Sequence, residues 1–312
     1  MKPTTKKLLS ITLSILIVTL FVFYISRHLE DFKQLELVNY PIIVVLAVII
    51  LLSSTFNGMM TDFLVSAFGI KLRLKEWFGL SVITTFYNII TPFRGGMAAR
   101  AVYLKHKHNF SYSNFLAALA GTYIMSFLIA AFFGLVSLCF LYKQLKIFSP
   151  LVLLIFLIFF IPLLLIFIFS PKFSETKSSL ANKIINVMNG WHLIHKQRKL
   201  VTIVAIISTI QLFMGAFSYI VSYYIFSIQI SLAQAIFMSS FGTFAILISI
   251  TPAGLGIQEG VSVFSALAIG ITPAQAISVA VLNRVITMVV MFTLGPIFSY
   301  ILLKHKPKET KK

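Results

Sequence analysis

Residues 91–96 read Thr-Pro-Phe-Arg-Gly-Gly and residues 251–256 read Thr-Pro-Ala-Gly-Leu-Gly, and each motif interrupts a long apolar stretch. Proline lacks the backbone donor that a helix needs and clashes with the preceding turn, while glycine has a high entropic cost in a helix. Each motif therefore ends one helix and precedes another. The helical halves within 77–103 and 233–270 are about fifteen residues long, which is too short to cross a bilayer alone.

These two interrupted stretches decide the fold. Irregular backbone at membrane depth is stable only where it is buried in protein or lines a wet cavity. We therefore interpret 77–103 and 233–270 as re-entrant helical hairpins, each returning to the membrane face from which it entered. Two kinked spans are the alternative interpretation.

The composition is that of a membrane protein. Of the 312 residues, 59% are hydrophobic and 11% are charged, and the mean hydropathy is +0.97. Soluble domains usually carry about 25% charged residues. Six apolar stretches are long enough to be spans, namely 8–26, 41–68, 112–141, 150–169, 200–226 and 273–303. The predicted fold is an all-α polytopic membrane protein with about six transmembrane helices and two re-entrant hairpins.

The charge balance predicts the orientation. The chain has 26 Lys and Arg against 8 Asp and Glu, a formal net charge of +18. Most basic residues lie in short loops, including one expected at 105–108, where they orient the chain rather than bind nucleic acid. With both hairpins re-entrant, nineteen of these residues fall on one face and four on the other. This predicts a multi-pass protein of the cell (inner) membrane with both termini cytoplasmic.

An internal repeat is visible at an offset of 160 residues, which superimposes Thr91 on Thr251. The order span, broken hairpin, span occurs in repeat 1 (about 41–142) and again in repeat 2 (about 201–302), all within a single integral membrane domain, 1–312. The additional span 150–169 between them would turn the second copy upside down. Inverted repeats with broken helices are a recurring transporter architecture. Segment 178–199 predicts an amphipathic helix on the inner leaflet, with a packed linker helix as the alternative.

Ionisable residues at membrane depth are costly and are therefore functional candidates. The candidates are Asp62, Arg94, Arg100, Glu259 and Arg284. Arginine suits bidentate phosphate recognition. Our hypothesis is that the three arginines bind a lipid phosphate while Glu259 holds a basic group or a proton. The alternative is that Glu259 neutralises Arg284 or Arg100, and Asp62 is interpreted as a helix-end residue. No catalytic motif, metal site or cofactor is predicted.

Three segments resemble the lysylphosphatidylglycerol synthase transmembrane region, a flippase-like family. They are Thr-Pro-Phe-Arg-Gly-Gly-Met-Ala-Ala-Arg-Ala-Val-Tyr-Leu (91–104), Thr-Pro-Ala-Gly-Leu-Gly-Ile-Gln-Glu-Gly (251–260) and Asn-Arg-Val-Ile-Thr (283–287). The resemblance implies substrate-binding or gating roles for matching positions: Arg94, Gly96, Arg100, Pro252, Gly254, Gly256, Glu259 and Arg284. The sequence departs from the family pattern at Met97-Ala98 and Thr122-Tyr123-Ile124, where acidic or paired charged residues are common.

The resemblance also implies a function. We expect a lipid flippase or transporter that moves an anionic or aminoacylated phospholipid, a glycolipid or a polyprenyl-linked lipid between leaflets by alternating access. Membrane lipids are the expected partners, and no oligomeric state is predicted. The alternative is a lipid-headgroup transferase similar to phosphatidylglycerol lysyltransferase, or the membrane subunit of a separate lipid-modifying enzyme. The chain ends nine residues after its last span, so we expect no cytoplasmic transferase domain.

Overall fold

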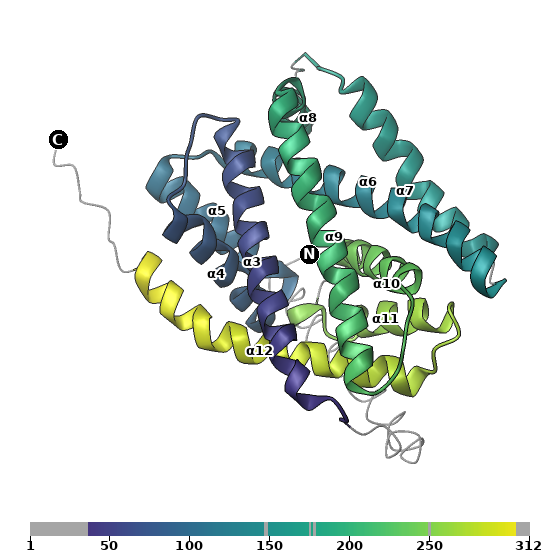
Figure 1. Ribbon diagram of the computed structural model, residues 1–312. Coiled ribbons are helices and arrows are strands. Elements are labelled where there is room, and N and C mark those ends of the chain that lie inside the picture. Colours follow the sequence, from purple (N-terminus) through teal and green to yellow (C-terminus); the bar gives the residue numbers. More distant parts are fainter. Residues whose placement is uncertain (1–36, 147–148, 175, 177–178, 249–250, 304–312) are drawn as a thin grey trace.

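The computed structural model describes residues 37–303, except 147–148, 175, 177–178 and 249–250. Every regular element in this part of the chain is helical (Figure 1). The α-helices are α3 (Ile43–Ser66), α4 (Leu74–Ile90), α5 (Gly95–His108), α6 (Tyr112–Leu145), α7 (Pro150–Phe169), α8 (Ser179–Lys196), α9 (Arg198–Ile225), α10 (Leu232–Phe244), α11 (Ile257–Leu267) and α12 (Pro273–Leu303). Short 3-10 helices are η1 (Tyr40–Ile42), η2 (Pro92–Arg94), η3 (Ala245–Ile248) and η4 (Pro252–Gly254).

Five helices in the described region are long and apolar enough to cross a membrane. They are η1 with α3, α6, α7, α9 and α12, and they correspond to five of the six predicted spans. The remaining predicted span, 8–26, lies outside the described residues. The chain is therefore an all-α polytopic membrane protein, as predicted.

The first broken stretch folds as a helical hairpin, called hairpin 1 here, with arms α4 and α5 and with η2 at its tip. The arms pack against each other in antiparallel directions. Three hydrogen bonds join them in sequence from tip to open end: Gly96 N to Asn88 Oδ1 (2.9 Å), Arg100 Nε to Thr84 Oγ1 (2.9 Å) and Tyr103 Oη to Glu76 Oε1 (2.9 Å).

The second broken stretch forms hairpin 2, with arms α10 and α11 and with η3 and η4 at its tip. Its arms also pack together. At the open end Gln234 donates a hydrogen bond of 3.4 Å to the carbonyl of Ile269, and nearer the tip the rings of Phe241 and Phe264 lie 5.6 Å apart. Gln234, early in α10, thus contacts a residue just after the end of α11, while Phe241, late in α10, contacts Phe264 within α11, so the arms are antiparallel.

The elements recur at the offset of 160 residues that the sequence indicates. The order α3, hairpin 1, α6 matches α9, hairpin 2, α12. The packing follows the same relation, because α4 packs on α12 while α10 packs on α6. The equivalent helices α3 and α9 lie side by side and run in opposite directions (Figure 1). At one end Val38 N donates to the Ile225 carbonyl (3.0 Å), and at the other Gln197 Nε2 donates to the Ala67 carbonyl (3.3 Å).

Two surface features differ from the simplest sequence interpretation. The apolar side of α8 packs inward rather than facing lipid: Trp191 and Ile194 are buried, and Gly190 lies against Ala117 of α6. The alternative interpretation, a packed linker helix, therefore fits α8 wherever its side chains can be described. The segment 105–108, expected to be a loop, forms the last turn of α5, which ends where Asn109 adopts a left-handed conformation (φ 51°).

Candidate functional site

The tip of hairpin 1 has an unusual backbone. Thr91 is extended and precedes Pro92, which cannot continue α4. Phe93 and Arg94 then both have positive φ angles, 55° and 56°. Such conformations cost on the order of 1–3 kcal/mol for residues other than glycine and occur where the surrounding structure holds them. One contact that holds this tip is made by the Arg94 side chain, whose Nη1 donates a hydrogen bond to the Tyr123 hydroxyl of α6 (2.6 Å).

Gly96 allows the two arms of hairpin 1 to meet directly below this tip. A Cβ atom at this position would lie 1.9 Å from the carbonyl oxygen of Thr84 and 2.8 Å from Asn88 Oδ1. Only glycine fits at such an approach, because neither the backbone oxygen nor the amide that binds the Gly96 N–H can move away cheaply. The site residue Gly96 is thus a packing residue that fixes where the tip lies.

Arg100 is buried one to two turns further along α5. Its guanidinium donates to three neutral acceptors: Nε to Thr84 Oγ1 (2.9 Å), Nη1 to Thr61 Oγ1 (2.8 Å) and Nη2 to Asn57 Oδ1 (3.1 Å). These partners orient the side chain without cancelling its charge. Within the described residues no carboxylate forms an ion pair with Arg100, so the alternative pairing of Arg100 with Glu259 is not what the structure contains.

At the tip of hairpin 2 the positive φ angles occur at glycines, whereas in hairpin 1 they occur at residues with side chains. Gly254 and Gly256 have φ angles of 63° and 78°, and Gly254 ends the short η4 helix that begins at Pro252. The Thr251 hydroxyl donates to the Leu255 carbonyl (2.9 Å), which closes the turn. This compact turn ends at the N-terminus of α11, where unpaired backbone N–H groups favour an acidic residue.

Glu259 occupies that position in the first turn of α11. One of its oxygens accepts a hydrogen bond from the Gly256 N–H (2.6 Å), and the other forms an ion pair with Nη2 of Arg284 on α12. Both side chains are largely buried, with exposed fractions of 9% and 17%. The predicted alternative, in which Glu259 neutralises Arg284, therefore describes this structure, and the pair joins hairpin 2 to α12.

The hairpin tips meet at two neighbouring cavities. The larger, of about 480 Å³, is lined by both tips and by α3, α9 and α12, and its polar groups include Arg94, Asn283 and the pair Glu259–Arg284. The smaller, of about 210 Å³, is lined by Arg94, Arg100 and Tyr123 together with residues of α3, α6 and α9. Arg94 lines both cavities, so this residue lies where they adjoin.

The predicted site residues fall into two groups: those that line one or both cavities, and those that line neither. Arg94, Gly254, Glu259 and Arg284 line the larger cavity, and Arg94 and Arg100 line the smaller one. Gly96, Pro252 and Gly256 line neither cavity and instead shape the two tips. Whether these residues bind a substrate stays a prediction.

Several polar residues of the site were not predicted from the sequence. Tyr123 accepts the hydrogen bond from Arg94, and Asn57 and Thr61 bind Arg100. Asn283 accepts hydrogen bonds from Ser218 (3.4 Å) and Ser222 (3.0 Å) of α9. One signal was available, because Asn57 and Thr61 are four residues apart and so occupy one face of an apolar helix.

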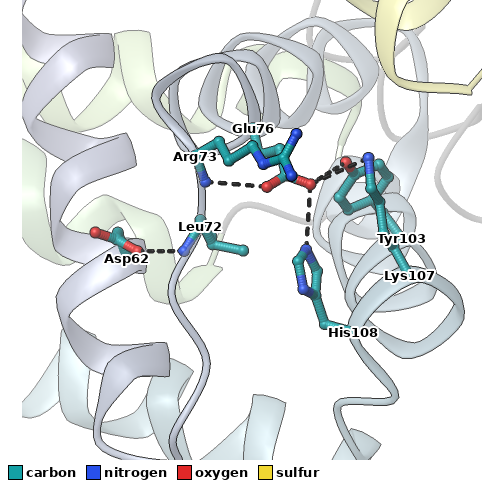
Figure 2. Close-up of polar contacts among 7 residues, drawn as sticks. All are labelled: Asp62, Leu72, Arg73, Glu76, Tyr103, Lys107 and His108. Atoms are coloured by element: carbon teal, nitrogen blue, oxygen red, sulfur yellow. Dashed lines mark hydrogen bonds and ion pairs between the residues drawn. The ribbon is translucent and has the colours of Figure 1, made fainter.

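A second polar cluster at the open end of hairpin 1 was also missed, because Glu76 was not among the candidates. Its carboxylate accepts from the Arg73 N–H (3.0 Å) and the Tyr103 hydroxyl (2.9 Å) and lies 3.2 Å from both Lys107 Nζ and His108 Nε2 (Figure 2). Burial would raise the pKa of Glu76, but these hydrogen bonds and the charge of Lys107 outweigh it and lower the pKa to about 2.

The other residues near this cluster have structural contacts. Asp62 accepts a hydrogen bond from the Leu72 N–H (2.8 Å) and so fixes the loop between α3 and α4, in agreement with its interpretation as a helix-end residue (Figure 2). Burial and the neighbouring Glu76 raise the pKa of Tyr103. In the described ranges no three His, Cys, Asp or Glu side chains come together as a metal site would require.

The fold and the cavities together define a polytopic helical membrane protein whose polar cavities lie between the tips of two helical hairpins. The chain belongs to the family described as the lysylphosphatidylglycerol synthase TM region, which it matches over residues 10–295. This membership associates the chain with membrane lipids. No curated protein matches the chain, and no solved structure matches it.

Proposed function

We propose that this protein moves a lipid between the two leaflets of the membrane, with the lipid headgroup passing through the cavities at the hairpin tips. One observation carries the proposal: the tips of both hairpins and the middle of α12 together line a cavity of about 480 Å³ that contains charged and polar side chains. Small-molecule sites usually measure about 300–1,000 Å³, so a headgroup fits. The family membership supports a lipid as the ligand.

The proposal includes alternating access by inverted repeats. The antiparallel course of the equivalent helices α3 and α9 supports repeats of opposite orientation, about 41–142 and 201–302. In this arrangement hairpin 1 enters from the cytoplasmic face and hairpin 2 from the outer face, with both termini cytoplasmic and the protein in the cell membrane. Exchange between two near-equivalent packings of the hairpins would expose the cavity to each face in turn.

A headgroup transferase is a less suitable function for this cavity. Such an enzyme needs a general base that is free to take a proton in the transition state. The carboxylate in the larger cavity, Glu259, is already bound by Arg284 and by the Gly256 N–H. This arrangement favours translocation by the chain over group transfer, and the same argument applies to a membrane subunit that completes a partner's active site.

Reconstitution of the purified chain into liposomes tests the function. Acyl-chain-labelled lipids are added in trace amounts, and the fraction accessible to a membrane-impermeant quencher is followed over time. We expect leaflet exchange well above that of protein-free liposomes, and a large loss in Arg94→Ala. Lys146→Ala is the matched control, because Lys146 is an exposed basic residue at the far end of α6. Headgroup turnover without leaflet exchange would favour the transferase instead.

The ion pair provides a second test. Glu259→Gln removes the carboxylate that pairs with Arg284 in a largely buried site, and breaking such a pair costs about 3–5 kcal/mol. The double exchange Glu259→Arg with Arg284→Glu restores opposite charges. It removes the carboxylate from the N-terminus of α11, so we expect exchange to recover only in part. No recovery in a well-folded double variant would indicate that Glu259 contacts substrate rather than serving only as the partner of Arg284.

A further inference from the structure

The two cavities have an unbalanced charge. Their described lining residues include three arginines, Arg94, Arg100 and Arg284, and one carboxylate, Glu259, so the formal net charge is +2. The carboxylate and Arg284 cancel within the larger cavity. The excess therefore belongs to Arg94 and Arg100, which both line the smaller cavity.

The carboxylate is poorly placed to receive a cationic headgroup. One Glu259 oxygen is paired with Arg284 and the other accepts the Gly256 N–H at 2.6 Å. An ammonium group that approached Glu259 would compete with the largely buried guanidinium of Arg284 for the same carboxylate. Breaking a buried ion pair is strongly destabilising, so the exchange of one cation for another at Glu259 is unfavourable.

Arg100, in contrast, is ready to receive an anion. A guanidinium has five N–H donors, and three of them are used by Thr84, Thr61 and Asn57. The remaining two N–H groups are the ones available to a ligand in the adjoining cavity. Because all three acceptors are neutral, they fix the direction of the guanidinium and leave its positive charge intact.

Arg94 adds a second cation to the same small space. The positive charges of Arg94 and Arg100 repel each other, and Arg94 is held in place by a neutral phenol, Tyr123. Arg100 is buried and Arg94 is partly buried, and no carboxylate in the described part of the chain pairs with either. Two like charges in such a place are unfavourable, and an anion between them would relieve the repulsion. Arginine pairs bind phosphate well, since each guanidinium can donate two parallel hydrogen bonds.

We propose, on the basis of the lipid-moving function above, that the cavity between Arg94 and Arg100 binds the phosphate of an anionic lipid headgroup. The protein then selects a headgroup of net negative charge over an aminoacylated, net positive one. The smaller cavity of about 210 Å³ accommodates the phosphate. The rest of the headgroup lies in the larger cavity, which adjoins at Arg94.

Liposome exchange with two matched lipids tests this selectivity. Phosphatidylglycerol and lysylphosphatidylglycerol with the same labelled acyl chains differ in headgroup charge. We expect the wild-type chain to exchange phosphatidylglycerol at least tenfold faster. If neither lipid exchanges, the proposed function itself is wrong. If both exchange and the aminoacylated lipid is equal or faster, the function stands and the charge selectivity is overturned.

Variants of the cavity assign the selectivity to its residues. Arg100→Gln should reduce the tenfold preference to less than threefold, while Arg100→Lys, which keeps the charge but loses the planar fork, should retain part of it. Ser126→Asp adds a carboxylate to the cavity wall and should shift the preference toward the aminoacylated lipid. Lys75→Gln, at an exposed position on hairpin 1, is the control. A preference unchanged in both Arg100→Gln and Ser126→Asp, each eluting as a monodisperse protein, would overturn the assignment.

Free phosphate is the other source of the same chemistry. The same liposomes are therefore assayed for uptake of radiolabelled inorganic phosphate, and we expect uptake no faster than in protein-free liposomes. Uptake of phosphate that is lost in Arg100→Gln, without exchange of phosphatidylglycerol, would show that the cavity serves a soluble anion and would overturn the lipid assignment.

Discussion

The guanidinium of Arg94, at the strained tip of hairpin 1, donates a hydrogen bond of 2.6 Å to the hydroxyl of Tyr123 in the first half of α6. The guanidinium carbon also lies 5.8 Å from the centre of the tyrosine ring. Both residues line the smaller cavity. This contact holds the tip against a long span and fixes the position of a charge that the cavity would otherwise leave free to move.

Tyr123→Phe removes the acceptor and keeps the ring, so Arg94 loses its partner while the packing changes little. Hydrogen bonds to charged groups contribute about 1.5–3 kcal/mol, and we expect a loss of stability of about 1–2 kcal/mol together with slower lipid exchange. Thermal unfolding in detergent and the liposome assay measure the two effects. Tyr112→Phe is the control, because Tyr112 is exposed at the start of α6. Equal behaviour of the two variants would contradict a role for this contact.

Gly96→Ala should separate the arms of hairpin 1. Its Cβ would lie 1.9 Å from the Thr84 carbonyl oxygen, which cannot move without distorting α4. Overpacking usually costs about 1–3 kcal/mol, and we expect at least the upper end of that range here. The measurement is the midpoint of thermal unfolding in detergent.

Gly260→Ala is the matched control for that substitution. Gly260 lies in α11, has no other atom near the place of a Cβ, and does not have a positive φ. Alanine is favoured over glycine within a helix by about 0.5–1 kcal/mol, so this variant should be neutral or slightly stabilised. If both glycine variants lose stability alike, the close approach of the arms at Gly96 is wrong.

The Glu76 cluster predicts how stability depends on pH. The pKa of Glu76 is lowered to about 2 from an ordinary value of 4.5, so the folded state favours the ionised form. Its contribution is present above pH 4.5 and is lost as the pH falls from there toward 2. It amounts to on the order of 1–2 kcal/mol, because the exposed Lys107 partner is screened by solvent.

Glu76→Gln should therefore be less stable than the wild type at pH 7, and the difference should shrink between pH 5 and pH 3. Thermal unfolding in detergent at pH 7, 5, 4 and 3 measures it, and subtracting the two curves cancels the other carboxylates. A constant difference across this range would contradict the lowered pKa.

The fold was largely predictable because its decisive features are local. Thr91-Pro92 ends α4, and Thr251-Pro252 begins η4 at the other tip, although α10 itself already ends at Phe244. Both motifs therefore marked the tips from the sequence alone. The offset of 160 residues followed from the same two motifs. Span positions depend on apolar length alone, and five of them fall in the described region where expected.

The site was only partly predictable, because its contacts join residues far apart in the chain. Which carboxylate neutralises which arginine depends on how α11 packs on α12, so Glu259–Arg284 was one alternative among several. Met97 and Tyr123 were noted only as departures from a charged pattern, and both line the smaller cavity. The packing of α8 against α6 was also not predictable from the sequence. Apolar residues at helical spacing suit contact with lipid and contact with α6 equally well.

The proposed re-entrant course of both hairpins predicts which positions share a membrane face. Cys139 is first replaced by serine, and single cysteines are then introduced at exposed positions beside the open ends: Lys71 and His106 for hairpin 1, Gln229 and Thr272 for hairpin 2. Because the arms of each hairpin are antiparallel and neither arm exceeds 17 residues, the two ends of one hairpin must lie on one side.

An impermeant thiol reagent applied to intact cells should label Gln229→Cys and Thr272→Cys, and should label Lys71→Cys and His106→Cys only after permeabilisation. Labelling of Lys71→Cys and His106→Cys from opposite faces would make hairpin 1 a kinked span. The two cavities would then no longer be reached from opposite sides by equivalent elements, and alternating access through them would lose its structural basis.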